Sequence, residues 1–373
     1  MIVVIADDIT GAAEIAGIGH RYGLSIHFVT RLGERLPECD LLVYATDTRS
    51  MSCEEAVKET RRVINELQTS GIHRLFKKTD SALRGHIIEE LRVLLEETGY
   101  RNVLWLPENP SRGRTIEEGI YYLDHRPLAE TDFAFDPEFP ALTSSVIERF
   151  PEARWIQGDL PALSGQIFLA DACSVQDIGN YLRQCSFDTL LAGAADLFTA
   201  YLESLGYRTV KRTPFDGLGT KNALIVCGST QSVSLEETPY CRRKRIRSCR
   251  MPYEVFKGFI PPDTWMESLK EDYRQRGTLL LTIGHPSEGG KAFALRLRNT
   301  IGEAVGRLIL NCLPQEIIIE GGATAFSVLE KAGWQRFRIT DEVASGVIRM
   351  KSEAGPYVIL KPGSYQWGEQ LFQ

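Results

Sequence analysis

The chain has 373 residues, of which 43% are hydrophobic and 25% are charged. This length fits two domains that each bury a core, and the composition is that of an ordinary globular protein. The formal net charge of −6 argues against nonspecific binding to nucleic acid or to anionic membranes. The longest apolar runs, such as 279–283, are far too short to cross a bilayer, so we expect no membrane partner.

The N-terminus and the cysteines both favour a cytoplasmic enzyme. The chain opens on a strand-like run and lacks the basic region and apolar region of a secretory signal. Its eight cysteines are scattered, and none stand in a Cys-x-x-Cys pair. We therefore expect buried or incidental thiols rather than a metal site or disulfides.

Strand-like and helix-like segments alternate along the first half of the chain. Apolar, β-branched runs predict strands, and segments with helical periodicity separate them. The predicted strands are 2–5, 26–30, 41–46, 74–78, 103–107, 167–171 and 190–193, and the clearest helices are 52–68 and 87–97. This alternation predicts an α/β domain with a largely parallel sheet.

A second domain is predicted to begin after a polar segment at 211–221. This segment contains Pro214, Gly217 and Gly219, which are typical of a linker, and we expect it to act as a hinge. The pattern then restarts, with predicted strands at 223–227, 279–283 and 316–320 and a long helix at 291–310. The sequence thus predicts an α/β fold of two domains, 1–210 and 222–373. Each is expected to be a mostly parallel sheet flanked by helices, with the active site in the cleft between them.

Two adjacent acids follow the first predicted strand. Asp7 and Asp8 stand between the strand 2–5 and an apolar helical pattern that begins at Ile9. The turn after a parallel strand is where α/β proteins bind ligands. Adjacent like charges repel, which favours a functional role, although acids at a helix start also act as N-caps. Both interpretations remain open from the sequence.

Basic residues beside hydroxyl or acidic residues follow three further strands. They are Arg49 after 41–46; Lys77, Lys78, Asp80, Ser81 and Arg84 at the end of 74–78; and Arg112 and Arg114 after 103–107. The carboxyl ends of parallel strands meet at one edge of a sheet, so we expect these residues to converge. Arginine can bind a carboxylate through two hydrogen bonds, and aspartate accepts hydrogen bonds from hydroxyls. Each loop alone could be a capped turn, but together they predict a site for a small polyhydroxylated acid.

Glycines follow the strands of the second half. They are Gly228 with Ser229, Gly284, and the run Gly321-Gly322-Ala323-Thr324. A glycine between a strand and a helix lets backbone N–H groups approach a phosphate. The usual nucleotide fingerprints, G-x-x-x-x-G-K-[ST] and G-x-G-x-x-G, are absent, and a tight turn would explain Gly321-Gly322 equally well.

These motifs resemble those of the four-carbon acid sugar kinase family, long catalogued as a domain of unknown function. The family's Asp-Asp-x-Thr-Gly-Ala stands at 7–12, its Lys-Lys-x-Asp-Ser-x-Leu-Arg-Gly at 77–85 and its Gly-Arg-Thr at 113–115. The resemblance covers nearly the whole chain. It implies a kinase that uses ATP and Mg²⁺ to phosphorylate a tetronate such as threonate, erythronate or a 3-oxo-tetronate.

The resemblance also implies which residues do what. The N-terminal domain would bind the sugar acid, through residues at the four strand ends: Thr10, Arg49, Lys77, Lys78, Ser81, Arg84, Arg112 and Arg114. Phosphoryl transfer needs an acceptor for the hydroxyl proton, for which we expect Asp8 or Asp7, with Asp80 as the next candidate. The C-terminal domain would bind ATP through Gly228, Ser229, Gly284, Gly321, Gly322, Ala323, Thr324 and Gly363. No metal ligand is assigned, because Mg²⁺ usually bridges the nucleotide phosphates.

The chain departs from the family pattern on the nucleotide side. Ala323 replaces an acid, Gln231 stands where serine is common, and the segment from Lys361 lacks the family's second glycine. One alternative function is therefore a sugar-acid sensor that has lost productive ATP binding. A metal-dependent hydrolase or aldolase using Asp7, Asp8 and His86 is a second alternative, which the lack of clustered histidines disfavours. The expected partners are the sugar acid and ATP, with a homodimer as the candidate assembly; the identity of the acid stays open.

Overall fold

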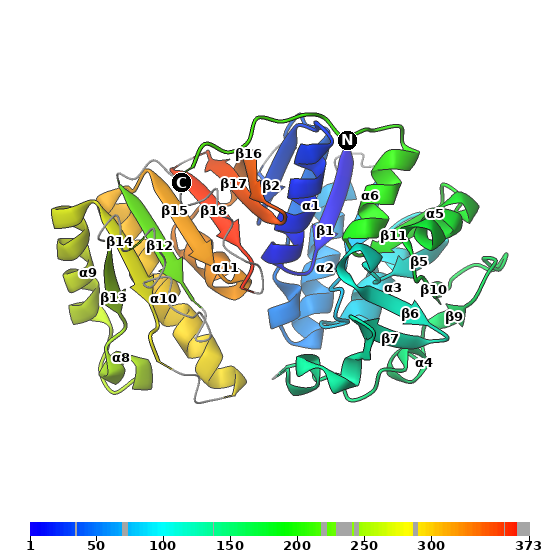
Figure 1. Ribbon diagram of the computed structural model, residues 1–373, viewed down its shortest axis with the longest axis horizontal. Helices are drawn as coiled ribbons and strands as arrows, with labels where there is room; N and C mark the ends of the chain where they lie inside the picture. The colour runs from blue at the N-terminus through cyan, green and yellow to red at the C-terminus, as the bar shows by residue number, and fades with distance from the viewer. Residues whose placement is uncertain are drawn as a thin grey trace. The chain divides into compact units, whose positions relative to one another are not determined.

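The protein forms two compact units (Figure 1). The computed structural model describes residues 1–33, 36–68, 74–136, 138–217, 222–228, 241, 246–285, 290–353 and 355–363. The first unit consists of 1–25 and 32–210, and the second consists of 26–31 and 211–373. Residues 218–221 of the expected linker and Ser229 of the expected nucleotide site lie outside the described residues.

The first unit is built on a parallel sheet in the order β3-β1-β4-β11-β5-β10-β9. Its strands are β1 (Ile2–Ala6), β3 (Leu41–Ala45), β4 (Leu75–Lys78), β5 (Asn102–Leu106), β9 (Arg154–Ile156), β10 (Ile167–Ala170) and β11 (Thr189–Gly193). The central strands are buried along their whole length. Burial on both faces explains why they read as continuous apolar runs.

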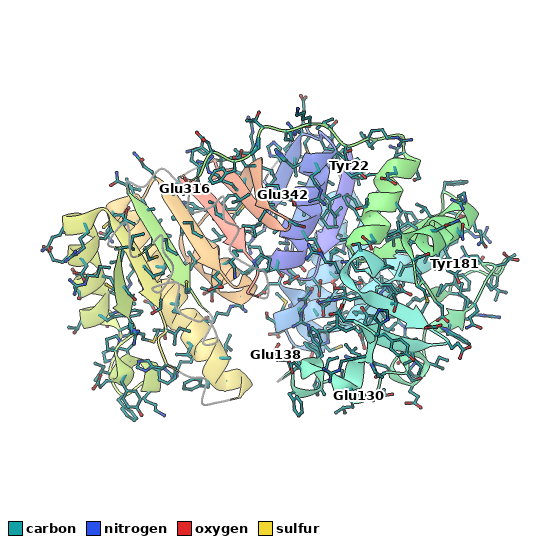
Figure 2. The ribbon with its side chains drawn as sticks, in the orientation of Figure 1. Tyr22, Glu130, Glu138, Tyr181, Glu316 and Glu342 are labelled. Carbon is teal, nitrogen blue, oxygen red and sulfur yellow. The ribbon has the colours of Figure 1, made fainter. Side chains whose placement is uncertain are left out.

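Helices cover both faces of this sheet. They are α1 (Ile9–Arg21), α2 (Cys53–Gln68), α3 (Ile87–Glu97), α4 (Val146–Arg149), α5 (Val175–Gln184) and α6 (Ala195–Ser204), with short 3₁₀ turns η1 (Thr48–Ser50), η2 (Pro110–Arg112), η3 (Leu128–Glu130) and η4 (Asp132–Phe135). Successive strand residues point to opposite faces, and the last two residues of β4 show which helix covers which face. Lys77 pairs with Glu90 of α3, whereas Lys78 lies near Glu14 of α1. On the face of α1, the hydroxyl of Tyr22, which Figure 2 labels, also donates to Glu203 of α6 (2.7 Å).

A small antiparallel sheet is inserted between β5 and β9. It consists of β6 (Arg114–Glu117), β7 (Ile120–Leu123) and β8 (Arg126–Pro127). The two tight turns place Glu118-Gly119 and Asp124-His125 at positive φ, which is the backbone of a two-residue hairpin turn. No pattern in the sequence predicted this sheet.

The second unit contains an eight-stranded sheet in the order β13-β14-β12-β15-β18-β17-β16-β2. Its elements are β2 (Ile26–Val29), β12 (Ala223–Cys227), β13 (Arg247–Arg250), α8 (Tyr253–Lys257), α9 (Asp263–Arg276), β14 (Thr278–Thr282), α10 (Lys291–Cys312), β15 (Glu316–Glu320), α11 (Gly322–Lys331), β16 (Arg336–Ala344), β17 (Val347–Ser352) and β18 (Tyr357–Lys361). Five neighbouring strands of this sheet are parallel, namely β13, β14, β12, β15 and β18. The sheet continues through β17, β16 and β2 in antiparallel pairs.

One strand of the second unit comes from the beginning of the chain. β2 pairs with β16, placing Phe28 opposite Phe337 with their rings edge to face at 6.2 Å. The expected strand at 26–30 therefore exists, but it belongs to the second unit rather than to a continuous 1–210 domain.

The two α/β units agree with the fold class predicted from the alternating pattern. Most predicted strands end within one or two residues of the observed ones, because apolar β-branched runs mark buried parallel strands directly. Within the described ranges, no helix is both long and apolar enough to span a membrane.

Candidate active site

Asp8 caps the first helix. It follows β1 and precedes α1, and its carboxylate accepts hydrogen bonds from the N–H groups of Gly11 (2.9 Å) and Thr10 (3.3 Å) and from the Thr10 hydroxyl. Burial opposes ionisation of Asp8, but the Arg49 charge and the Thr10 hydroxyl outweigh it and lower its pKa. Asp8 is therefore the N-cap of α1, and Thr10 hydrogen-bonds to its carboxylate.

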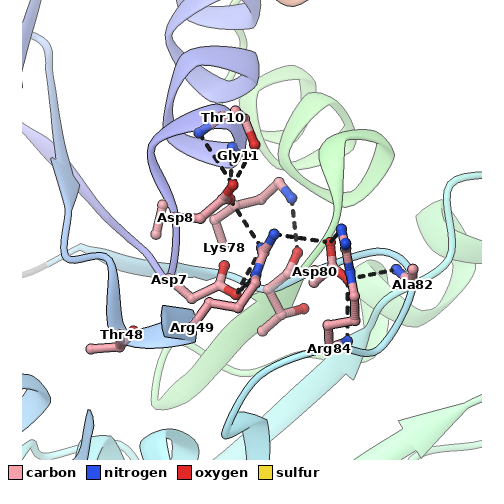
Figure 3. Close-up of polar contacts among 12 residues, drawn as sticks. Asp7, Asp8, Thr10, Gly11, Thr48, Arg49, Lys78, Asp80, Ala82 and Arg84 are labelled. Carbon is pink, nitrogen blue, oxygen red and sulfur yellow. Dashed lines mark hydrogen bonds and ion pairs between the residues drawn. The ribbon is translucent and has the colours of Figure 1, made fainter. Parts of the chain in front are cut away.

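Arg49 joins three carboxylates (Figure 3). Its Nε donates to Asp7 (2.8 Å), its Nη2 to Asp8 (3.0 Å), and its Nη1 lies 3.5 Å from Asp80. The side chain is 14% exposed. Because all three of its nitrogens face these acids, Arg49 offsets part of their negative charge and holds three loops together.

Asp80 is bound on its other side by Arg84. The guanidinium donates from Nε (2.7 Å) and Nη2 (3.1 Å), and the backbone N–H groups of Ala82 and Arg84 also point at the carboxylate. Burial opposes ionisation, but the charges of Arg49 and Arg84 hold the pKa of Asp80 well below its usual range. Asp80 is thus a member of the cluster whose charged form the two arginines stabilise.

Asp7 differs from the other two acids. It is 3% exposed, and its Oδ1 is buried without a hydrogen-bond partner, while Oδ2 binds Arg49. Burial raises its pKa, and the neighbouring Asp8 charge raises it further against the opposing effect of Arg49. A carboxylate with an unoccupied oxygen and a raised pKa has the properties of a general base.

The two lysines of β4 do not share a position. Lys77 is 1% exposed and forms a buried ion pair with Glu90 on the α3 face. It is therefore not part of the Arg49 cluster, which consists of Arg49, Asp7, Asp8, Asp80 and Arg84. The Nζ of Lys78 donates to the Thr79 carbonyl (2.8 Å) on the α1 face. A Cβ on Gly11 would lie 3.4 Å from this nitrogen and 2.8 Å from Asp8, so Lys78 is beside the helix cap.

Basic side chains surround Phe133 next to this cluster. The guanidinium groups of Arg84 and Arg114 lie 5.4 and 5.8 Å from the centre of its ring, and Arg114 donates to the Ser81 hydroxyl. Ser81, Arg84 and Arg114 therefore converge as predicted from their loops. Arg112 is exposed in η2.

Sequence reasoning missed Arg149. It lies at the end of α4, where its Nη2 donates to the Leu83 carbonyl (3.0 Å) and its Nη1 is buried without a partner. Burial lowers the pKa of Arg149, and the charges of Asp80 and Asp136 partly restore it. No motif surrounds this position, and only the buried, incompletely paired guanidinium marks it.

In the second unit, the predicted nucleotide residues gather at the carboxyl ends of β14, β12, β15 and β18, which are neighbouring parallel strands. Gly228 lies against the start of α11, where an added Cβ would be 1.9 Å from the Thr324 hydroxyl. Gly321 has φ +96° and caps α11, which begins with Gly322, Ala323 and Thr324. Gly284 follows β14 at φ +69°.

A buried ion pair also lies at this edge. Lys361 donates to Oε1 of Glu320 (2.5 Å) and lies 3.4 Å from the Gly363 carbonyl, whereas Oε2 of Glu320 is buried without a partner. Glycines at a helix N-terminus can accommodate a phosphate, and a spare carboxylate oxygen suits Mg²⁺ or its water shell. The residues present therefore fit a magnesium nucleotide.

Comparison with known proteins identifies the family. The family model of a sugar-binding N-terminal domain matches residues 2–155. A D-threonate kinase of Bordetella bronchiseptica is 30% identical over 98% of this chain and 94% of its own length, and one of Cupriavidus necator is 32% identical over 95% and 91%. The chain belongs to the four-carbon acid sugar kinase family.

Other members of this family extend the comparison. A 3-oxo-tetronate kinase of Methylobacterium radiotolerans is 23% identical over 97% of this chain and 95% of its own length. A crystal structure of a Haemophilus influenzae protein shares the fold, with a TM-score of 0.75 and 20% identity over 100% of this chain and 98% of that one. The family inferred from the motifs at 7–12 and 77–85 is confirmed. All the residues of the Arg49 cluster lie within the matched sugar-binding region.

Proposed function

We propose that this protein is a cytoplasmic, ATP-dependent kinase that phosphorylates a hydroxyl of a four-carbon sugar acid. One observation carries the proposal: three carboxylates gather around Arg49, and one of them, Asp7, keeps a buried oxygen without a partner. A substrate hydroxyl is the group that would complete this oxygen's hydrogen bonding. The family relationship supports phosphoryl transfer as the reaction.

Asp7 is our preferred proton acceptor. As the hydroxyl oxygen attacks the γ-phosphorus of ATP, its proton passes to Oδ1 of Asp7 and ADP leaves. The carboxylate of Asp8 is already bound by Thr10, Gly11 and Arg49, and Asp80 is held by two arginines. These two acids orient Arg49 and balance its charge, so they act as positioning residues.

The acid group of the substrate would bind at the basic side of the cluster. Arg149 has a buried donor to offer, and Arg84 is 29% exposed beside Phe133. Arginine binds a carboxylate with charge-assisted hydrogen bonds. The four-carbon length of the acid is taken from the relatives, which are named D-threonate kinase and 3-oxo-tetronate kinase.

ATP is assigned to the second unit. The backbone at Gly228, Gly321 and Gly322 would receive its phosphates, and Glu320 would hold the magnesium or its water. Magnesium supplies neutralisation of the phosphate charge that builds up during transfer. Gly284 and Gly363 remain members of the proposed nucleotide site.

The test is a coupled assay of ADP release over D- and L-threonate, D- and L-erythronate, 3-oxo-tetronates and glycerate, with ATP and Mg²⁺. At least one four-carbon acid should raise the rate above the ATP-only background, and chelation of Mg²⁺ should abolish the increase. If none of these acids raises the rate of ADP release above the ATP-only background in correctly folded protein, the kinase proposal fails.

A sensor without phosphoryl transfer is the second candidate. The observation that favours it is Ala323, which stands in the first turn of α11 where the family usually has an acid. Thermal-shift measurements separate the two candidates, because a bound ligand raises the melting temperature. A sensor would respond to a tetronate but not to ATP, whereas the kinase would respond to both.

A further inference from the structure

Three side chains with metal-binding groups meet in the first unit, away from the contacts described above. Within the described residues, the thiol of Cys53, the ring of His86 and the carboxylate of Glu89 place one ligand atom each within 4.8 Å of the others. Cys53 is the first residue of α2, His86 precedes α3, and Glu89 stands in the first turn of α3. Cys53 is exposed and the other two are half-buried, so an ion can enter from solvent.

The ring of His86 is held by a hydrogen bond to the backbone. Its Nε2 lies 2.9 Å from the Met51 carbonyl. A carbonyl can only accept, so Nε2 carries the proton and the neutral ring keeps its lone pair on Nδ1. Metal-binding histidines commonly donate their other N–H to a backbone carbonyl in this way. This hydrogen bond is the second observation, besides proximity, that points to a ligand.

The spacing is close to that of a zinc site. Zinc bonds to sulfur, nitrogen and oxygen are about 2.0–2.3 Å long, so ligand atoms in a tetrahedral site lie about 3.3–3.8 Å apart. The 4.8 Å limit on the three ligand atoms exceeds this spacing by about 1 Å. Rotation about the side-chain bonds of the exposed Cys53 and the half-buried Glu89 can bring the atoms that much closer. We propose that Cys53, His86 and Glu89 bind Zn²⁺, with water at the fourth position and release of the thiol proton to solvent.

The donor set selects among ions. A thiolate, an imidazole and a carboxylate suit Zn²⁺, whereas Mg²⁺ prefers oxygen ligands alone. This site is therefore distinct from the magnesium of the proposed nucleotide.

The position of the site gives it a consequence. Cys53 follows η1, which carries Arg49, and His86 follows the loop that carries Asp80 and Arg84. The hydrogen bond from His86 to Met51 already connects these two segments. A zinc ion would join them more firmly and limit their separation, and would thereby stabilise the Arg49 cluster.

The test replaces zinc with Co²⁺, whose bond to a thiolate gives a charge-transfer absorption band in the near ultraviolet. The fully reduced wild-type protein should develop this band at one equivalent of Co²⁺ and lose it when Zn²⁺ is added. Cys53→Ser should lack the band, and Glu89→Gln should weaken Co²⁺ binding by at least the roughly 10–100-fold that loss of an outer partner costs. Cys173→Ser is the matched control, because Cys173 is also an exposed free thiol.

A second readout keeps the result independent of spectroscopy. Zn²⁺ should raise the melting temperature of the wild-type protein and of Cys173→Ser, but not that of Cys53→Ser, and EDTA should reverse the rise. Circular dichroism of the metal-free proteins checks that all variants are folded. The proposal is overturned if the wild-type protein shows no thiolate band, or if the band survives in Cys53→Ser. Neither readout depends on kinase activity, so the two proposals fail separately.

Discussion

At the scale of single residues, Asp7 and Asp8 are neighbours with different environments. Asp8 uses its oxygens to cap α1 and bind Arg49, whereas Asp7 keeps Oδ1 unoccupied. Asp7→Asn should therefore lower kcat by roughly 10²–10⁴ with little change in folding, since the base is lost but the shape is kept. Steady-state kinetics with the best sugar acid measure this. Asp8→Asn should lose less activity, because asparagine still caps a helix; the reverse order of the two effects would assign the base to Asp8.

The pH dependence should reflect the same difference. A base acts when it is deprotonated, and burial raises the pKa of Asp7 above that of an ordinary aspartate. We expect kcat/KM to fall as the pH decreases, with its midpoint above the usual carboxyl range, and Asp7→Asn to remove this acidic limb.

Protonation of Asp80 should lower the stability of the fold, whereas protonation of Asp7 should raise it. The folded pKa of Asp80 lies well below the unfolded value, so its contribution is full at neutral pH and is lost as the pH falls through the folded pKa. The raised pKa of Asp7 has the opposite effect: its charge destabilises the fold at neutral pH, and protonation relieves this cost. Melting curves of Asp7→Asn and Asp80→Asn across pH would separate these contributions.

Arg149 is the residue that should set affinity for the acid group. A hydrogen bond to a charged group contributes about 1.5–3 kcal/mol, so Arg149→Gln should raise the KM for the sugar acid roughly 10–100-fold and leave the KM for ATP nearly unchanged. Arg183→Gln is the matched control, since Arg183 is exposed on α5 and its loss should change either KM by less than about threefold. Equal effects of the two substitutions would remove Arg149 from the proposed site.

At the scale of elements, the contact between β12 and α11 depends on a missing side chain. Gly228 leaves no room for a Cβ, which would lie 1.9 Å from the Thr324 hydroxyl. Gly228→Ala should therefore displace the start of α11, lower the melting temperature and weaken nucleotide binding at least tenfold, about 1.4 kcal/mol. Gly99→Ala is the steric control, because nothing lies within 4 Å of its added Cβ and Gly99 belongs to no proposed site. Calorimetric titration with an ATP analogue would compare them, and unchanged binding by Gly228→Ala would contradict the assignment.

The elements also show how far sequence reasoning reaches. Buried parallel strands such as β1 and β15 are apolar runs, so their positions could be predicted. The small sheet β6–β8 could not, because its strands are short and mix charged with apolar residues. The loops carrying Arg49, Asp80 and Arg84 converge because the parallel topology brings strand ends together, which the sequence predicted. The separate directions of Lys77 and Lys78, the free oxygen of Asp7 and the meeting of Cys53 with His86 depend on side-chain packing, which no local pattern encodes.

At the scale of the whole molecule, the early strand β2 contributes to the core of the second unit. Phe28 is fully buried and packs on Phe337 of β16. Phe28→Ala should cost about 3–5 kcal/mol and increase hydrogen exchange first in β16 and β17. Phe76→Ala is the counterpart in the first unit, where Phe76 packs on Phe198 with ring centres 5.1 Å apart, and should increase exchange in β4 and β11. Hydrogen exchange with peptide resolution would show whether the two lesions stay in separate units.

This arrangement changes how the two units are connected. The chain passes between them after Ser25, after Arg31 and after Val210. The segment 211–221, which we expect to be a hinge, follows the last of these three crossings.

The same strand has a consequence during synthesis on the ribosome. β2 leaves the ribosome well before its partner β16, which lies far along the chain. At about 5–20 residues per second, the roughly 300 intervening residues take roughly 15–60 s to make. Throughout that interval the edge of β2 that pairs with β16 has no partner strand. An unpaired apolar strand is a surface that a chaperone can bind. Slower translation of the second half would lengthen the time during which the nascent chain can aggregate.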